Sequence, residues 1–559
     1  MANALEAASL VMIPSGYEDG TLGSLKPTDG SGDFTFSRGS NLSATRINEQ
    51  GYIEKGYENL LLQSNSFLTT WITSGQMLTP VGGQSGYDGT NDAWKIQRSD
   101  TTAQNIKQNV SQSGVQTFSV YAKKGNVDYI SLISVGGAVT KAIFSLPADG
   151  SGTNTLLDSD NISASIEYIS EGWYRVSATF NQPITDIRIY PSETASTEGG
   201  SVSDAFIYIQ DAMLNQGLVA YPYIETTTAP VAGGILEDMP RLDWSGSCPS
   251  LLLEPSRTNV LSHSEYLNGI SWAGQVDITF TPNYGISPEG VKNSTRIQFA
   301  DDTAYAYLSA TITTNAVASV YVKGTSGETF RFGLANNAAS GGLLHTFSGE
   351  WERISNTKNT NGQLIISSYG GTALDFEAYG LQLEQDATYP TSYIPTYGVS
   401  QTRLRDNARI SSAAGVIGQS AGTIFADFIP TKSFGAQLIE IANGSTDRIF
   451  TKDQINGAFR FDINANKSQV VDYTSPTGLI TEGQSNKFAI TYSASGYALY
   501  INGSKITSAN DSVVFNSDID ALYLAQTYSG QNINDFKTNN VILFPTALSD
   551  SECIALTTI

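Results

Sequence analysis

The sequence predicts an all-β protein, in which tandem antiparallel β-sandwiches of the jelly-roll type follow an extended N-terminal arm. Three observations predict this fold. The chain has 28 Tyr and 52 Gly in 559 residues and is rich in Ser, Thr and Asn, which is typical of short strands joined by many turns. Strand-like segments follow one another at short spacing without helical periodicity. A set of motifs also recurs in the same order, which indicates a duplicated β domain.

The duplication is carried by four segments of the first repeat that return in the second. A duplicated β domain more often multiplies binding surfaces than builds one active site. The matching segments are 59–67 with Trp71 and 259–266 with Trp272, 119–123 and 319–323, 172–177 and 350–355, and 220–226 and 390–396.

Composition shifts and turn-rich stretches divide the chain into five parts. The first part has only short apolar pieces that cannot close a core, so we expect it to dock on a neighbouring domain or on another subunit. The expected parts are an N-terminal anchoring arm at 1–56, a β-sandwich at 57–228, a connector at 229–251, a second β-sandwich at 252–398, and a third β domain of different rhythm at 405–559.

Two segments of the third domain give specific predictions of local structure. Residues 496–505 alternate apolar and polar positions around Asn502 and Gly503, which predicts a β-hairpin. Ser549 precedes a short apolar segment and is followed three residues later by Glu552, which predicts an N-cap and a short terminal helix.

The charge argues against two classes of partner. With 31 basic and 53 acidic residues the formal net charge is −22. A protein that binds nucleic acid or an anionic membrane surface needs clustered Lys and Arg instead. No apolar run approaches the ~20 residues of a membrane span, and no signal peptide is evident. The two cysteines, Cys248 and Cys553, are expected to be unpaired, incidental thiols. These features favour assembly in a reducing cytoplasm.

The sequence offers no catalytic constellation. Histidine occurs only at 263 and 345, without a nucleophile motif nearby, and no spacing singles out a pair of carboxylates. We therefore expect no enzyme, no cofactor and no catalytic residue, and the sequence does not locate a ligand site.

Two further candidates have a functional and a structural interpretation. The loop 86–92 has three oxygen donors that suit Ca²⁺, but a polar Asp-Gly turn explains it equally, and the second repeat has no evident counterpart, so no metal is predicted. Trp71, Trp173, Trp272 and Trp351 suit either sugar stacking or the sandwich core, and burial in the core is the expectation.

Several segments of the chain resemble known protein families. Its third domain resembles the concanavalin A-like, laminin-G-type jelly rolls, through the hairpin 496–505 and the closing segment 541–552. The repeats resemble carbohydrate-binding-module-like jelly rolls common in virion proteins of tailed bacteriophages, and the N-terminal part is similar to openings of phage fibre proteins. The first repeat departs from the second where 211–215 stands in place of 380–384. The segments that carry this resemblance are 59–62 with Trp71, 86–89, the strands at Trp173 and Trp351, 393–396, 13–17, 36–39, 44–48, 240–244 and 252–259.

The resemblance implies a structural component of a tailed-phage virion, assembled in the host cytoplasm. A fibre or tail-associated appendage that contacts host surface polysaccharide is the first hypothesis, with other virion proteins bound through the arm. A decoration or assembly protein without a receptor role is the second, and a polysaccharide-degrading appendage is the third. Phage fibres are commonly trimers, and a lone chain would leave the arm's apolar pieces unsatisfied, so we expect a homo-oligomer, more readily a trimer than a dimer.

Overall fold

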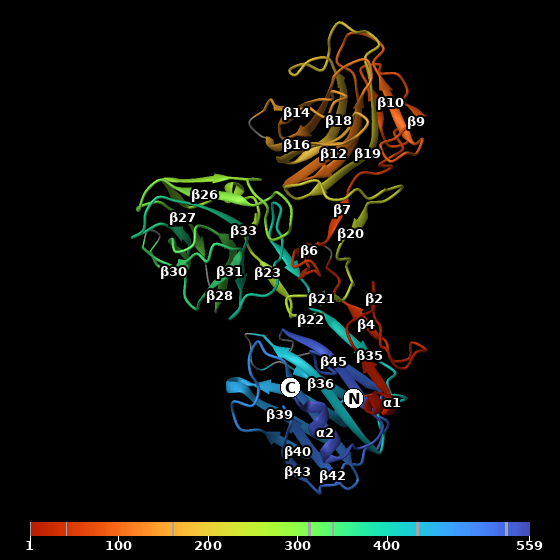
Figure 1. Ribbon diagram of the computed structural model, residues 1–559, viewed down its shortest axis with the longest axis vertical. Coiled ribbons are helices and arrows are strands. Elements are labelled where there is room, and N and C mark those ends of the chain that lie inside the picture. Colours follow the sequence, from red (N-terminus) through yellow and green to blue (C-terminus); the bar gives the residue numbers. More distant parts are fainter. Residues whose placement is uncertain are drawn as a thin grey trace.

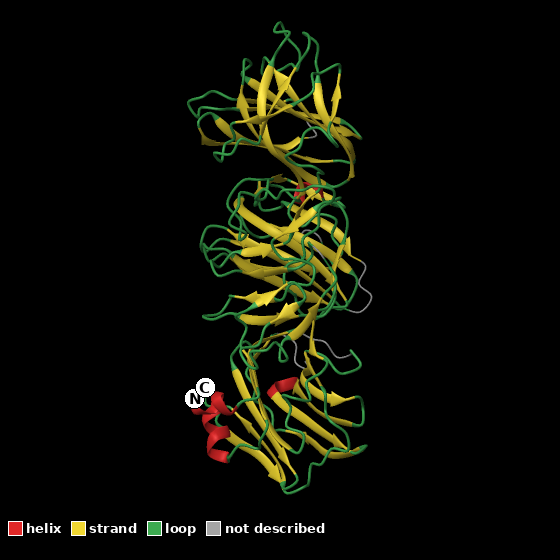
Figure 2. Cartoon of the chain, turned by 90° about the vertical axis from the view of Figure 1, so that its right-hand side faces the viewer, coloured by secondary structure: helices red, strands yellow, loops and turns green. Residues whose placement is uncertain are grey.

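The computed structural model describes all residues except 1, 41, 159–160, 311–314, 338–339, 432–434, 436 and 531–534. Three β-sandwiches are stacked along the long axis of the molecule (Figures 1 and 2). The helices α1 (Ala2–Ala7) and α2 (Asp550–Thr557) and both ends of the chain lie on the C-terminal domain. The predicted fold class, all-β with tandem antiparallel sandwiches, is confirmed.

The first sandwich packs two antiparallel sheets around an apolar core. In β17, for example, Tyr174, Val176 and Phe180 alternate with outward-facing residues and are buried in that core, as the two-residue period of a strand requires. One sheet contains, in spatial order, β16 (Asn161–Ser170), β17 (Trp173–Asn181), β12 (Val115–Lys124), β19 (Phe206–Gln216), β10 (Ala93–Gln97) and β9 (Val81–Gln84). The other contains β15 (Asn154–Leu156), β14 (Val139–Ser145), β13 (Tyr129–Gly136), β18 (Ile184–Ser192), β11 (Asn105–Gln112) and β8 (Ile72–Ser74).

The second sandwich repeats this plan. Both repeats have a register shift at the same place, between Ser119 and Tyr121 in the first and between Ser319 and Tyr321 in the second. One sheet contains β25 (Ile278–Thr281), β26 (Thr295–Phe299), β33 (Leu374–Gln385), β23 (Arg257–Asn259), β34 (Gln401–Arg403), β28 (Ala316–Lys323) and β31 (Glu352–Lys358). The other contains β24 (Gly274–Val276), β27 (Tyr305–Ala310), β32 (Gly362–Ser367), β29 (Thr329–Ala335) and β30 (Leu343–Thr346), and the 3-10 helix η1 spans Leu267–Gly269.

The C-terminal sandwich is completed by strands from the arm and the connector. Leu10, Met12, Phe34 and Phe36 of the arm are buried in its core. One sheet contains β21 (Arg241–Asp243), β22 (Ser250–Leu253), β45 (Phe536–Phe544), β36 (Ala421–Pro430), β41 (Asn486–Ser493), β42 (Gly496–Ile501) and β43 (Ser504–Ala509), with β1 (Leu10–Met12) beside β45. The other contains β2 (Tyr17–Glu18), β3 (Thr21–Leu22), β4 (Phe34–Ser37), β35 (Asn407–Ile410), β44 (Ala521–Leu524), β37 (Gln437–Asn443), β38 (Asp447–Gln454), β39 (Ala458–Ala465) and β40 (Ser468–Thr474), and the 3-10 helix η2 spans Ile455–Gly457.

A buried ionic network lies where the arm, the connector and the bridge to the C-terminal domain meet. Arg241 pairs with Glu254 at 2.6 Å and with Asp406, while Arg38 pairs with Asp406 at 3.2 Å and Arg403 with Glu254 at 3.0 Å. The guanidinium groups of Arg403 and Arg241 hold the pKa of Glu254 below its ordinary value, against the effect of burial. Two small antiparallel sheets flank this region: the hairpin of β5 (Thr45–Ile47) and β6 (Ile53–Lys55), and the pair of β7 (Tyr57–Asn59) and β20 (Val231–Gly233), which lie on either side of the first sandwich in the sequence.

Both local predictions for the third domain are confirmed. Strands β42 and β43 form the hairpin, with Asn502 and Gly503 at positive φ in its turn. Helix α2 begins with a capping box, in which the Ser549 side chain accepts from the Glu552 backbone and the Glu552 side chain accepts from the Ser549 backbone.

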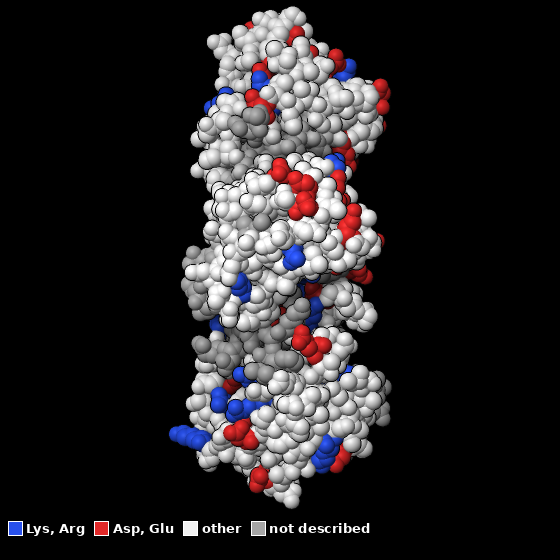
Figure 3. All heavy atoms as spheres, turned by 90° about the vertical axis from the view of Figure 1, so that its left-hand side faces the viewer, with Lys and Arg blue, Asp and Glu red and all other residues white. Residues whose placement is uncertain are grey.

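Charged groups are interspersed on the face shown in Figure 3. Basic and acidic side chains alternate there with large uncharged areas, and the described residues form no continuous basic stripe on this face. Within the described part of the chain, no helix is long and apolar enough to cross a membrane.

Candidate functional site

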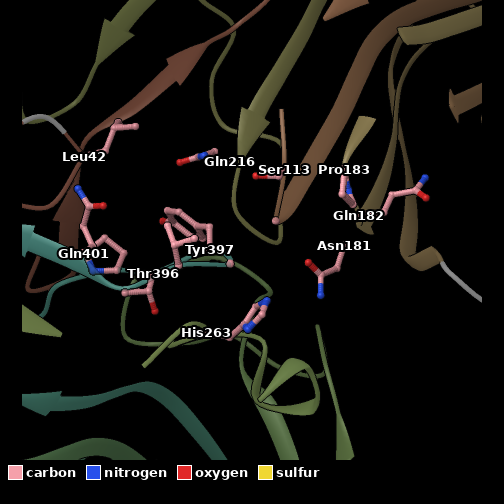
Figure 4. A pocket seen from close by; sticks show the side chains of 14 residues that line it. Leu42, Ser113, Asn181, Gln182, Pro183, Gln216, His263, Thr396, Tyr397 and Gln401 are labelled. Carbon is pink, nitrogen blue, oxygen red and sulfur yellow. The ribbon is translucent and has the colours of Figure 1, made fainter. Parts of the chain in front are cut away.

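A cleft of about 320 Å³ lies between the first two sandwiches. The first sandwich contributes the turn between β11 and β12, the turn between β17 and β18, and the end of β19, while the second contributes His263 and the segment that leads into β34. In Figure 4 these side chains surround one space, with His263 below it. The volume is within the ~300–1,000 Å³ of ordinary ligand sites. The lining residues are Leu42, Ser113, Gly114, Asn181, Gln182, Pro183, Gln216, His263, Pro395, Thr396, Tyr397, Gly398, Val399 and Gln401.

Hydrogen bonds between the first two sandwiches hold the cleft in place. The backbone N–H of Val115 donates to the carbonyl oxygen of Tyr397 at 2.7 Å. This approach needs glycine at position 114, because a Cβ there would lie 1.7 Å from the same carbonyl oxygen. The side-chain amide of Asn283 in the second sandwich also donates to Ser163 Oγ of the first at 2.7 Å and to the Leu218 carbonyl at 2.8 Å. The cleft is therefore a built junction between the sandwiches.

The lining carries no charged side chain, although the chain has 84 charged residues (31 basic and 53 acidic). The amides of Asn181, Gln216 and Gln401 are half-buried, and they make no side-chain hydrogen bond within the described residues. Tyr397 adds an aromatic ring. Such a surface suits a neutral ligand that has many hydroxyl groups and one apolar face.

His263 carries an unpartnered polar atom at this cleft. The residue is 7 % exposed, its Nδ1 lies 3.0 Å from Ser262 Oγ, and its Nε2 has no hydrogen-bond partner in the described structure. The hydroxyl of Thr396 is likewise buried and unpartnered there. Burial lowers the pKa of His263, so the imidazole is neutral at pH 7. A buried donor or acceptor without a partner costs about 1–3 kcal/mol, and a ligand hydroxyl in the cleft recovers that cost.

Behind Tyr397 lies a buried ion pair that links the arm to this junction. Lys55 Nζ lies 2.6 Å from Glu265 and 3.1 Å from Glu289, and it also lies over the rings of Tyr221 and Tyr397 at 5.2 and 5.4 Å. The opposite charges of Glu265 and Glu289 raise the pKa of Lys55, although burial acts in the other direction. Tyr397 is thus fixed on one side by the protein and faces the cleft on the other.

The structure separates the two histidines. His263 lies at the cleft, whereas His345 lies on β30 beside Glu352, with its Nε2 3.3 Å from Oε1. Within the described residues, no three His, Cys, Asp or Glu side chains are placed to hold a metal ion.

The loop 86–92 closes on itself as a polar turn. The Gly86 N–H donates to the Thr90 carbonyl at 2.9 Å, and the carboxylate of Asp88 accepts from the Thr90 backbone and hydroxyl at 3.1 and 2.6 Å. The expectation that the second repeat has no counterpart is wrong, because the loop 287–294 takes the same place before β26 that 86–93 takes before β10. The sequence hid this because the two loops share almost no residue types.

The tryptophans follow the core expectation only in part. Trp71 is buried in the core of the first sandwich, and Trp272 is half-buried against the core of the second. Trp173 is buried on the outer face, where its ring meets Tyr87 edge-on with centroids 6.3 Å apart. Trp351 is half-buried, and its Nε1 donates to the Ile286 carbonyl at 3.1 Å. Burial is therefore confirmed for Trp173, although its ring lies outside the apolar cluster of the sandwich interior. The core interpretation is wrong for Trp351, which is half-buried.

No family model matches the chain, and no curated protein matches it. Parts of several solved structures are similar to it. The CBM40 domain of Ruminococcus gnavus IT-sialidase, bound to α2,3-sialyllactose, is 21% identical over 26% of this chain and 87% of its own, with a TM-score of 0.24. Domain 4 of AbnA, a GH43 arabinanase from Geobacillus stearothermophilus in complex with arabinotriose, is 13% identical over 29% and 77%, with a TM-score of 0.22. Domains LG4–5 of the mouse laminin α1 chain are 11% identical over 49% and 94%, with a TM-score of 0.19.

Proposed function

We propose that the protein binds a neutral glycan in the cleft between its first two sandwiches, as a structural component of a tailed-phage virion that contacts the host surface. The observation that supports glycan binding is the uncharged lining of the cleft together with the unpartnered Nε2 of His263. Sugar hydroxyls both donate and accept, so they satisfy the free amides and the imidazole together. A sugar ring also stacks on an aromatic side chain such as Tyr397.

The elongated shape supports the role of an appendage. Both chain ends and the strands of the arm lie on the C-terminal domain, and the first sandwich lies at the opposite end of the long axis (Figure 1). Attachment through the C-terminal end leaves the cleft projecting outward. Weak single sites become effective on a particle because many copies engage one surface together.

A glycan array of bacterial surface polysaccharides tests the binding half with the full chain. We expect signal on at least one neutral polysaccharide, and a loss of at least about tenfold in the variant Asn181→Ala/Gln216→Ala, which removes two amides of the lining. The control Asn359→Ala/Gln484→Ala removes two exposed amides elsewhere and keeps the signal. Silence on all polysaccharides, or equal signal in both variants, rejects the cleft as a glycan site.

Immunogold labelling of intact virions tests whether the protein is a virion component and where it lies on the particle. Label at the tail tip or on projecting fibres supports an appendage. Label flat on the shell favours the decoration protein without a receptor role, and no label on particles rejects a virion component. A fall in the viscosity of a bound polysaccharide favours the degrading appendage instead.

A further inference from the structure

The two repeats place four corresponding side chains around one point on the outer face of each sandwich. The strand register defines the correspondence, because Tyr121 lies opposite Gln210 in the first repeat as Tyr321 lies opposite Tyr379 in the second, each beside the same register shift. The strands that follow the two loops keep this alignment. The corresponding pairs are Asn65 and Glu265, Asp88 and Glu289, Asp92 and Asn293, and Gln210 and Tyr379.

In the second repeat these positions bind an ammonium group. Lys55 reaches them from the arm, with Nζ 2.6 Å from Glu265 Oε1 and 3.1 Å from Glu289 Oε2. Asn293 and Tyr379 donate to Glu289 at 2.8 and 2.9 Å, and so hold that carboxylate in place. The Tyr393 hydroxyl also donates to Glu265 at 3.0 Å, so the arrangement is two carboxylates held by neutral donors around one enclosed cation.

The first repeat has the same ingredients without the cation. The Gln210 amide donates to Asp92 Oδ1 at 2.7 Å and to Asp88 Oδ1 at 3.3 Å, and the Asn65 amide donates to Asp92 Oδ2 at 3.1 Å. The Thr90 hydroxyl also donates to both carboxylates, so two carboxylates are again held by neutral side chains. Asp88 and Asp92 are exposed, so their free oxygen positions are open to solvent.

A third carboxylate lies beside this pair. Asp211 is 7 % exposed, its backbone N–H donates to Asn65 at 3.2 Å, and it accepts from the Tyr87 hydroxyl at 2.9 Å. We call Asn65, Asp88, Asp92, Gln210 and Asp211 the acidic recess. Within the described residues, no Lys, Arg or His lies within 4.0 Å of its carboxylates. Burial and the negative charges of Asp92 and Asp88 raise the pKa of Asp211 to about 6, as expected for a site that lacks its counter-ion.

We propose that the acidic recess of the first repeat binds a primary ammonium group of a ligand from outside the chain, in the place that Lys55 takes in the second repeat. Beside it the half-buried ring of Tyr87 stacks on Tyr121 with centroids 3.8 Å apart, and the guanidinium of Arg175 also lies over the Tyr121 ring, so Tyr87 is the ring next to the recess that a ligand can contact. An aromatic wall next to carboxylates recognises a cation together with an apolar ring face. A free-amine sugar and a lysine side chain both offer the ammonium. Ca²⁺ fits less well, because it takes six to eight oxygen ligands.

Isothermal titration of the full chain tests this proposal with four probes: a β-1,4-glucosamine tetramer, its N-acetylated form, Nα-acetyllysine amide and CaCl₂. We expect the free-amine tetramer to bind, and the N-acetylated tetramer to bind at least about tenfold more weakly because it has no charge. Binding of Nα-acetyllysine amide without the tetramer identifies a lysine as the source of the ammonium. The variant Asp88→Asn/Asp92→Asn loses the amine probe. The control Glu237→Gln/Asp302→Asn, which removes two exposed carboxylates elsewhere, retains it.

A second measurement guards against a variant that misfolds. Carboxyl NMR of the unmodified protein should show the pKa of Asp211 falling when the amine probe is added, because a bound cation favours its ionised form. The proposal is overturned if neither amine binds, if the recess variant binds as well as the control, or if only CaCl₂ gives heat that the variant removes. The recess is separate from the cleft, so Asn181→Ala/Gln216→Ala should leave amine binding unchanged whatever the fate of the glycan proposal.

Discussion

Lys55 Nζ lies 2.6 Å from Oε1 of Glu265, and this ion pair joins the arm to the second sandwich over 210 positions of sequence. Both side chains are almost wholly buried, and Glu289 completes the site at 3.1 Å. A buried ion pair contributes little net stability, but the loss of one partner leaves the other charged and desolvated.

The change Lys55→Met should therefore lower the free energy of unfolding by about 3–5 kcal/mol, since it leaves two glutamates buried without a cation. Urea unfolding of the full chain, followed by tyrosine and tryptophan fluorescence, measures the loss. The matched variant Lys55→Met/Glu265→Gln/Glu289→Gln removes all three charges and should recover most of it. Equal destabilisation in both variants would show that the packing of the Lys55 stem, and not its charge, stabilises the junction.

A second prediction concerns the contact between Gly114 and Tyr397. The change Gly114→Ala places a methyl group 1.7 Å from the Tyr397 carbonyl oxygen, at a φ of +83°, so the cleft walls must separate. We expect a loss of at least about 1–3 kcal/mol and altered scattering at low angle, as the first sandwich shifts. Gly89→Ala is the control, because Gly89 has the same φ and open space around it. An unchanged scattering curve for Gly114→Ala would contradict a rigid junction.

The duplication could be predicted from the sequence because the repeated motifs make the same local hydrogen bonds in both repeats. Asn59 and Asn259 each donate from their amide to two carbonyl groups of the same repeat, so both copies retain the residue. The departure at Asp211 was also visible, since Gly380 stands at the corresponding position, and both residues have a positive φ. Short segments whose side chains make a required hydrogen bond to the backbone are the easiest repeats to recognise in a sequence.

The cleft and the destination of the arm were not visible in the sequence. Gly114 and Tyr397 are almost 300 positions apart, and nothing local marks a turn glycine as a contact between domains. The acidic recess was hidden for another reason. Each repeat places two carboxylates around the corresponding point, but only Asp88 and Glu289 correspond in position. The second carboxylate is Asp92 in the first repeat and Glu265 in the second, so the sequences do not align there.

A third prediction follows from the burial of His263. Burial lowers its pKa below the ordinary 6.5, so the unfolded chain binds more protons than the folded chain at mildly acid pH. Stability is then fully present above pH ~6.5 and falls as the pH drops below it, by about 1.4 kcal/mol for each unit between the two pKa values. His263→Gln keeps a polar side chain and should lose this part of the pH dependence. Thermal melting between pH 5 and 8 compares the two proteins, and parallel curves would contradict the prediction.

The homo-oligomer stays a prediction. The structure buries Leu10, Met12, Phe34 and Phe36 of the arm within its own chain, whereas Leu25 and Tyr52 remain exposed. Native mass spectrometry at about 150 mM ionic strength, where screening acts beyond ~8 Å, is suited to a chain with a charge of −22. A trimer in the full chain supports the prediction, and a monomer at micromolar concentration rejects it.

The last prediction concerns the arm as part of the C-terminal domain. Strand β1 pairs with β45, and β4 pairs with β35, so residues 10–37 extend both sheets of that domain. Leu10, Met12 and Phe34 are fully buried there, and the burial of each such side chain contributes about 1.5–3 kcal/mol to stability. Removal of residues 1–37 should therefore lower the melting temperature of the C-terminal domain sharply and expose apolar surface that binds the dye ANS. Removal of residues 1–7 alone, which include α1, leaves these strands in place and is the control. If the longer truncation melts like the control, the paired strands do not stabilise the domain, and the arm is free to bind a partner instead.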